Sequence, residues 1–348
     1  MVPITSRFTS EAPLHPKASE LLSTVFERGW ADPSKIHEPS REAGRLLQEA
    51  RESFAAAFRV RTDEIYFLGE PSLGFHLGIN GLLTPQSRLF YSATDRAPVH
   101  AIADNRNNSG QRVLRNSQEI STPNDVLVHQ SVNPETGIIK PLPNDFAGNI
   151  FVDNTAFGVH SHLPTNWASA VWQSRSWQGP SGLGIFALRS QTQWRNPLPH
   201  NDSKKVPQAF SIPLALASAV ALENFTKETT QLQEQFEQFR KMVVDFLVRE
   251  IGNVIIAQEE GNTVASLISA SISGIDSERL VNELSERGVA IDTGSACMSA
   301  NMAPSHVLAA MGLPTTGNIR LTLHPQTTED EIDYLLNNLK ELVIRQRS

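Results

Sequence analysis

The sequence predicts an α/β protein with a large domain built on a mostly parallel, doubly wound sheet and a smaller α+β domain after it. Three observations predict this class. The chain has 348 residues, more than one small module needs. Up to about residue 190, short apolar segments closed by Gly, Pro, Asn, Asp or Ser alternate with helical segments. A long helical stretch then precedes a second, shorter alternation of strands and helices.

The large domain is expected to begin with two helices. They lie in ASELLSTVFERGW and REAGRLLQEARESFAAAF, where apolar residues recur at spacings of three and four. Short apolar segments then predict buried strands: EIYFLG, SRLFYSA, DVLVHQSV, NIFVDNT, SAVWQS and LGIFALR. The segments LGINGLL and PVHAIADNRN predict helices between the early strands. Ligands of such sheets collect beyond the carboxyl ends of the strands.

Near Ile212 the pattern changes to extended helix, through TKETTQLQEQFEQFRKMVVDFLVREIG. Beyond it, NVIIAQ, TVASLISASI, VAIDTGS and GNIRLTL predict strands, and SERLVNELSERG and TEDEIDYLLNNLKELVIRQ predict helices. Thr328 is the expected N-cap of the last helix, because acidic residues follow it in the first turn. This part is the predicted second domain.

Composition argues against several functional classes. With 30 basic and 37 acidic residues, the formal net charge is -7, which offers no basic surface for nucleic acid. No apolar run approaches the roughly 20 residues that span a bilayer, and the first residues do not form a signal-peptide pattern, so no membrane or export function is predicted. The single cysteine, Cys297, has no partner for an internal disulfide, and we expect a free thiol in a reducing cytoplasm.

Cys297 lies in GSACMSANMAPSHVLAAMG, between a predicted strand and a predicted helix. A lone cysteine is most often a small buried apolar residue. The Gly- and Ser-rich surroundings favour an exposed loop instead. An exposed thiol acts as a nucleophile once it is ionised.

The segment around Cys297, with IRLTLHPQTTEDEIDYLL after it, resembles the C-terminal signature of cysteine desulfurases, members of the class V aminotransferases. Three further segments resemble motifs of that family in the same order: ADPSKIHEPSREAG, NPETGIIKP and GPSGLGIFAL. The resemblance extends from about Pro13 to Leu342. It implies a fold-type-I aminotransferase-like homodimer, with a large cofactor domain over residues 13–225 and a small domain over residues 226–348 together with 1–12.

The resemblance also implies roles for individual residues. In the family, a lysine forms a Schiff base with pyridoxal phosphate (PLP), an aspartate pairs with the pyridine nitrogen, and a cysteine takes up the sulfur of L-cysteine as a persulfide. Cys297 matches this cysteine and Asp153 the aspartate, while Arg320 matches the arginine that holds the substrate carboxylate. Asn133 and Ser72 match two further cofactor-binding positions. The ordinary alternative for Asp153 and Arg320 is a charge at the end of a strand.

The sequence departs from the family at the lysine. In QSRSWQGPSG, Ser176 stands at that position, and a hydroxyl does not condense with an aldehyde to form an imine. Arg175 replaces the neighbouring histidine and is always protonated. Ala156 replaces a cofactor-binding glutamine. The nearest lysines downstream, Lys204 and Lys205, lie in a separate loop-like stretch.

The position that stacks on the cofactor ring is ambiguous. Without a gap, the family's Glu-His pair aligns with Asp95 and Arg96, and only a gap brings His100 into register. His37 and His306 are expected to pack or cap. His160 and His162 suggest a metal pair only weakly, because no Cys or acidic residue lies nearby at ligand spacing, and no metal site is predicted.

We therefore predict a cysteine desulfurase-like protein of sulfur-transfer metabolism. Sulfur from L-cysteine would form a persulfide on Cys297 and pass to an acceptor protein, for iron-sulfur or thio-cofactor assembly. Schiff-base activity is expected to be lost or severely reduced, because PLP has no covalent link at Ser176. Two alternatives stay open: a non-catalytic persulfide relay or regulatory partner, and a redirected enzyme that binds PLP or another ligand non-covalently.

Overall fold

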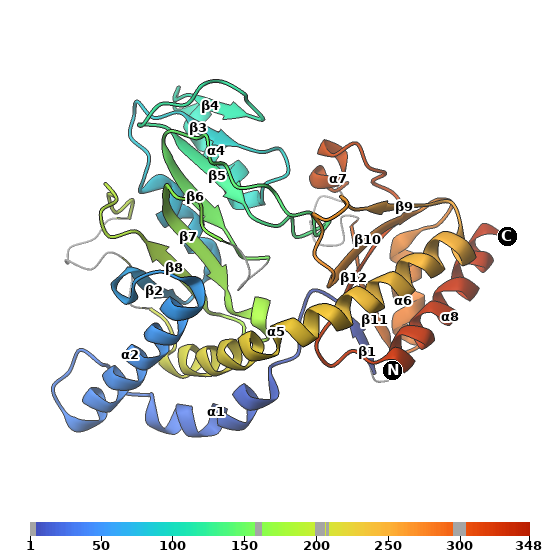
Figure 1. The fold of residues 1–348 in the computed structure, drawn as a ribbon, viewed down its shortest axis with the longest axis horizontal. Helices are drawn as coiled ribbons and strands as arrows, with labels where there is room; N and C mark the ends of the chain where they lie inside the picture. The colour runs from blue at the N-terminus through green and yellow to red at the C-terminus, as the bar shows by residue number, and fades with distance from the viewer. Residues whose placement is uncertain (1–4, 157–161, 199–205, 207–208, 295–303) are drawn as a thin grey trace. The chain divides into compact units, whose positions relative to one another are not determined.

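The computed structural model describes residues 5–156, 162–198, 206, 209–294 and 304–348. The chain divides into two units. The large unit comprises residues 13–131 and 140–228, and the small unit comprises residues 1–12, 132–139 and 229–348. Each is described by itself below (Figure 1).

The large unit is built on a seven-stranded sheet. In sheet order the strands are β2 (Ile65–Leu68), β8 (Gly184–Leu188), β7 (Trp167–Gln173), β6 (Asn149–Asp153), β5 (Val126–Gln130), β3 (Leu89–Tyr91) and β4 (Val113–Arg115). The strands from β7 to β4 pair in parallel, and β8 and β2 add antiparallel pairs at the other edge. The expected doubly wound, mostly parallel sheet is confirmed.

Helices cover both faces of this sheet, which is why most residues of its central strands are buried. On one face pack α1 (Pro16–Arg28), α2 (Glu38–Phe58) and the beginning of α5 (Ile212–Phe246). On the other pack α3 (Pro71–Phe75), the π-helix η2 (His76–Asn80) and α4 (Ala97–Asn108). Phe58 of α2 stacks on Trp172 of β7, with ring centroids 4.3 Å apart.

The small unit contains a five-stranded sheet in the order β1 (Ser6–Phe8), β11 (Val289–Thr293), β12 (Asn318–Thr322), β10 (Leu267–Ile272) and β9 (Val254–Ala257). Only the β1–β11 pair is parallel. The other described elements of this unit are the end of α5, η4 (Leu247–Ile251), α6 (Ser277–Glu286), α7 (His306–Ala310) and α8 (Glu329–Arg347). This is the α+β arrangement that the sequence predicts.

Local signals fix the helix ends. The hydroxyl of Thr328 accepts a hydrogen bond from the Glu331 amide, and the Glu331 carboxylate accepts one from the Thr328 amide. These two bonds form a capping box at the predicted start of α8. Asp276 caps α6 through the amides of Glu278 and Arg279. No helix among the described residues is long and apolar enough to cross a membrane.

Candidate functional site

The predicted cofactor residues of the large unit gather where its parallel strands end. Asp153 is the last residue of β6, beside Gln130 at the end of β5. The 3-10 helix η3 (Ser174–Trp177), which carries Ser176, follows β7 directly. Doubly wound sheets bind their ligands at this edge, so the structure brings these residues to the expected side of the sheet.

Both carboxylate oxygens of Asp153 face groups of the same chain. Asp153 is 2% exposed, and its Oδ1 accepts hydrogen bonds from the Thr155 amide at 2.9 Å and the Thr155 hydroxyl at 2.6 Å. Its Oδ2 lies 3.4 Å from Nε of Arg96, the residue that precedes α4. Of the two candidates for the ring-stacking position, Arg96 therefore pairs with Asp153, whereas His100 packs edge-on against Tyr91.

A second ion pair adjoins this one. Asp95 is 1% exposed and accepts a hydrogen bond from the Ser92 amide, and Nζ of Lys140 lies 3.4 Å from its Oδ1. Burial raises the pKa of Asp95 to about 6, although the Lys140 charge acts in the opposite direction. Burial, together with the charge of Lys140, lowers the pKa of His129 on β5 to about 4, so this imidazole is neutral at physiological pH.

Neither Lys140 nor His129 is predicted as a site residue from the sequence. Lys140 belongs to the segment NPETGIIKP, so its place in a family-like motif was a signal that could have been used. His129 lies in an apolar strand and carried no comparable signal.

Ser176 is held by the backbone. Its hydroxyl donates a hydrogen bond to the Thr155 carbonyl at 2.8 Å. The next residue, Trp177, is fully buried, and its indole N–H donates to the carbonyl and the hydroxyl of Ser218 in α5. This contact fixes the short helix that presents the Ser176 hydroxyl.

Ser72, at the expected phosphate position, lies in the first turn of α3. Its amide donates a hydrogen bond to the carboxylate of Glu70, at 2.9 Å. Pro71 begins the helix and has no N–H to offer. The first turn of this helix is thus capped by an acidic side chain of the chain itself.

Arg320 belongs to the small unit, on β12. Its Nη2 donates to the Thr293 carbonyl at 3.0 Å, and its Nη1 lies 4.0 Å from Oε2 of Glu135. Its buried Nε has no hydrogen-bond partner among the described residues. Ser305, just before α7, donates to the same Glu135 oxygen at 2.7 Å. A guanidinium with an uncommitted donor suits a carboxylate ligand.

Asn133 also belongs to the small unit. It is 2% exposed, and its side-chain oxygen accepts hydrogen bonds from the amides of Glu135 and Thr136, at 2.9 and 3.1 Å. These bonds close the turn that carries Glu135. The predicted cofactor residue thus supports the side chain that faces Arg320.

Some predicted residues lie outside the described ranges: Cys297, His160, Lys204 and Lys205. Among the residues that are described, His37 precedes α2 with its ring 3.2 Å from the Ser40 hydroxyl, His162 lies 3.4 Å from Arg59, and His306 begins α7. Within the same ranges, no three His, Cys, Asp or Glu side chains converge as metal ligands do.

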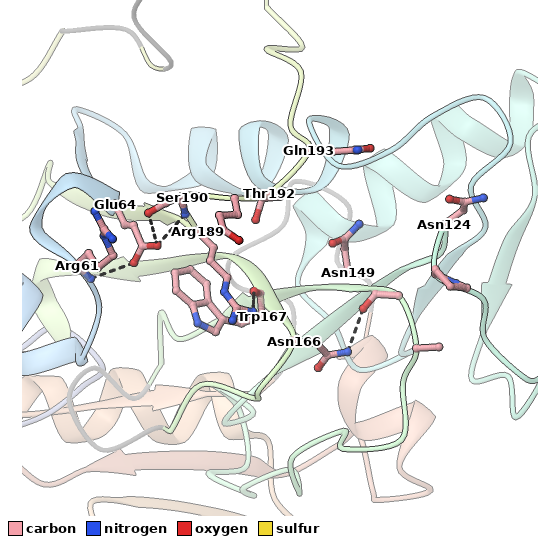
Figure 2. A pocket seen from close by; sticks show the side chains of 14 residues that line it. Arg61, Glu64, Asn124, Asn149, Asn166, Trp167, Arg189, Ser190, Thr192 and Gln193 are labelled. Carbon is pink, nitrogen blue, oxygen red and sulfur yellow. Dashed lines mark hydrogen bonds between the residues drawn. The ribbon is translucent and has the colours of Figure 1, made fainter.

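A separate polar pocket of about 800 Å³ lies at the opposite ends of the same strands, next to Asn149 and Trp167, which begin β6 and β7. Figure 2 shows the amides of Asn149 and Asn166 on one side of it and the bonded cluster of Glu64 and Ser190 on another. Glu64 accepts hydrogen bonds from the amide and hydroxyl of Ser190. The pocket contains none of the predicted site residues.

The resemblance implies that the residues at the cofactor positions bind PLP, but their chemistry does not fit this cofactor. Ser176 has no amine, the oxygens of Asp153 face Thr155 and Arg96, and the Ser72 amide is bonded to Glu70. In the small unit, by contrast, the arginine expected to bind a carboxylate keeps an uncommitted donor.

The chain is similar to known proteins along nearly its whole length. Residues 178–335 match the aminotransferase class V family. The chain is 25% identical to a cysteine desulfurase IscS of Dictyoglomus turgidum, over 98% of this chain and 94% of the relative. It is also 25% identical to a cysteine desulfurase of Trichormus azollae, over 96% of this chain and 91% of the relative.

The fold is that of solved NifS-like proteins. One NifS-like protein superposes with a TM-score of 0.84 at 19% identity, covering 98% of this chain and 99% of the other. A NifS-like protein from Rickettsia africae superposes with a TM-score of 0.83 at 14% identity, with the same coverage. The family match over residues 178–335 and the relatives along nearly the whole length show that this chain is similar to cysteine desulfurases, which are class V aminotransferases.

Proposed function

We propose that this protein carries sulfur in sulfur-transfer metabolism and does so without PLP Schiff-base turnover. Cys297 accepts sulfur that originates from L-cysteine, holds it as a persulfide and passes it to an acceptor protein. The proposal rests on Ser176, which the resemblance assigns to the lysine position and whose hydroxyl donates a hydrogen bond to the Thr155 carbonyl. Without an amine there, the chain has no group at that position to form an imine.

The chemistry left to the chain is thiol exchange. The Cys297 thiolate attacks the outer sulfur of a donor persulfide, so that a new sulfur-sulfur bond forms on Cys297 and the donor leaves as a thiolate. A second exchange with an acceptor thiolate regenerates Cys297. Neither step requires an external oxidant or reductant, because the sulfane sulfur keeps its oxidation state.

Arg320 supports the same proposal. Its uncommitted Nε and the neighbouring Glu135 carboxylate place one positive and one negative group together in the small unit. A small-molecule donor derived from cysteine carries the complementary carboxylate and ammonium. The proposal includes a homodimer in the cytoplasm, as the family resemblance and the single thiol suggest.

The first test measures sulfide and alanine release from L-cysteine with added PLP, for the unmodified protein and for Cys297→Ala. We expect neither protein to turn over. Turnover that disappears in Cys297→Ala would contradict the proposal, and Lys140→Ala would then show whether Lys140 supplies the amine.

The second test measures sulfur uptake. The protein is mixed with a PLP-dependent desulfurase and L-cysteine, and intact mass is recorded. Because Cys297 is the only cysteine, a mass gain of one sulfur atom that is reversed by a thiol reductant reports on this residue alone. Cys297→Ser is the matched control, and an unmodified protein that gains no sulfur would refute sulfur carriage.

A further inference from the structure

The charge of Asp153 is neutralised from within the chain. Nε of Arg96 lies 3.4 Å from Oδ2 of Asp153, and the two side chains are 28% and 2% exposed. The other oxygen of Asp153 accepts two hydrogen bonds from Thr155. A buried carboxylate requires such partners, because an unpaired buried charge is strongly unfavourable.

The Arg96 guanidinium places beside this oxygen the positive charge that a protonated pyridine ring would bring, and its Nε, at 3.4 Å, forms an ion pair and no hydrogen bond with it among the described residues. Arg96 follows Asp95, whose own carboxylate pairs with Lys140, so each acid of this cluster has a cation of the chain beside it. The charge of Asp153 is therefore balanced by the chain itself, without an added ring.

At the expected phosphate position, too, a side chain of the protein occupies the group that the cofactor would bind. At the start of α3, Glu70 accepts the hydrogen bond of the Ser72 amide, and Pro71 has no N–H. The Glu70 carboxylate already accepts the hydrogen bond of the amide that a phosphate group would use. The negative charges of Glu70 and the phosphate would also repel each other. Ser176, at the expected position of the Schiff-base lysine, donates a hydrogen bond to the Thr155 carbonyl.

We propose that Arg96 is an internal replacement for the cofactor's pyridinium, and that Glu70 replaces its phosphate. Side chains of the large unit then take the places of two charged groups of PLP. Ser176, at the lysine position, is one of several changes at the same site. This goes beyond the proposed function, since it holds whether or not Cys297 carries sulfur. It excludes the alternative in which PLP binds non-covalently.

The first experiment is a double-mutant cycle on the cofactor-free protein, with Arg96→Gln, Asp153→Asn and the double variant. We expect each single variant to lower the midpoint of thermal unfolding and the double variant to lower it by clearly less than the sum. Additive effects would show that the two side chains do not stabilise each other and would overturn the proposal. Arg175→Gln, in η3, serves as the control for loss of another positive charge of the large unit.

The second experiment titrates PLP and follows its absorbance and the trapping of an imine by borohydride, read by mass. We expect no binding by the unmodified protein and only weak binding by Ser176→Lys alone. Glu70→Gly/Arg96→His/Ser176→Lys is expected to bind at least about tenfold more tightly than Ser176→Lys. Equal binding by these two variants, tight binding by the unmodified protein, or a folded triple variant that binds no PLP would each refute the proposal. Cys297 takes no part in either readout, so the result is independent of sulfur carriage.

Discussion

Nη1 of Arg320 lies 4.0 Å from Oε2 of Glu135, and Ser305 donates a hydrogen bond to the same oxygen. Three separate segments of the chain thus meet in the small unit. Because Nε of Arg320 has no partner among the described residues, the guanidinium has a donor left for a ligand carboxylate.

Arg320→Gln is expected to slow the loading of Cys297 by cysteine persulfide about tenfold or more, since a charge-assisted hydrogen bond contributes about 1.5–3 kcal/mol. Cysteamine persulfide, which lacks the carboxylate, should load both proteins equally fast. Loading rates are measured by intact mass, with Arg279→Gln on the surface of α6 as the control. Equal slowing with both donors would contradict a carboxylate-binding role.

Asp95 predicts a pH dependence of stability. Burial raises its pKa to about 6 in the folded protein, from an ordinary value of 3.8, so the folded state binds this proton more tightly. The stabilising contribution is fully present below about pH 4 and is lost as the pH rises through about 6, a change on the order of 3 kcal/mol.

Denaturant unfolding at several pH values between 4 and 8 checks this sign. Asp95→Asn should remove that part of the pH dependence, because the amide does not titrate. A difference between the two proteins that stays constant across this range would show that Asp95 does not titrate there.

Trp177 is predicted to hold the segment that carries Ser176. The indole is fully buried and bonded to Ser218. Trp177→Ala should lower the free energy of unfolding by about 3–5 kcal/mol. Trp177→Phe keeps the ring but loses the N–H, and a cost of about 1 kcal/mol is expected. If Trp177→Phe is as harmful as Trp177→Ala, the shape of the indole matters more than its hydrogen bond.

Phe8 on β1 is 1% exposed and anchors this short strand beside β11. Phe8→Ala is expected to destabilise the small unit by about 3–5 kcal/mol, because it leaves a cavity in a packed core. Hydrogen exchange of the β11 amides measures this locally. Phe26→Ala is the matched control, since Phe26 is 53% exposed, and similar losses in both variants would refute an anchoring role.

Much of the fold follows from the sequence. Apolar runs such as NIFVDNT and LGIFALR become β6 and β8, and the polar spacing around Thr328 marks the start of α8. The strand β1 was missed, because three residues are too short to give a period. Its partner, β11, lies at the far end of the chain, where no local pattern points to it.

The site was predicted in part. The motifs identified Asp153 and Ser176, and both lie at the carboxyl ends of strands of the large sheet. The pairing of Arg96 with Asp153 was left open, because alignment alone does not tell which of Arg96 and His100 turns towards the carboxylate. The contact of Glu70 with the Ser72 amide was also missed, since it depends on how the chain turns before α3.

The parallel pair of β1 and β11 has a consequence for synthesis on the ribosome. The residues that surround the large sheet are translated before residue 229, whereas β1 waits for a partner that begins at Val289. At the usual pace of translation this wait lasts on the order of tens of seconds. The large unit is therefore able to fold before β1 pairs with β11.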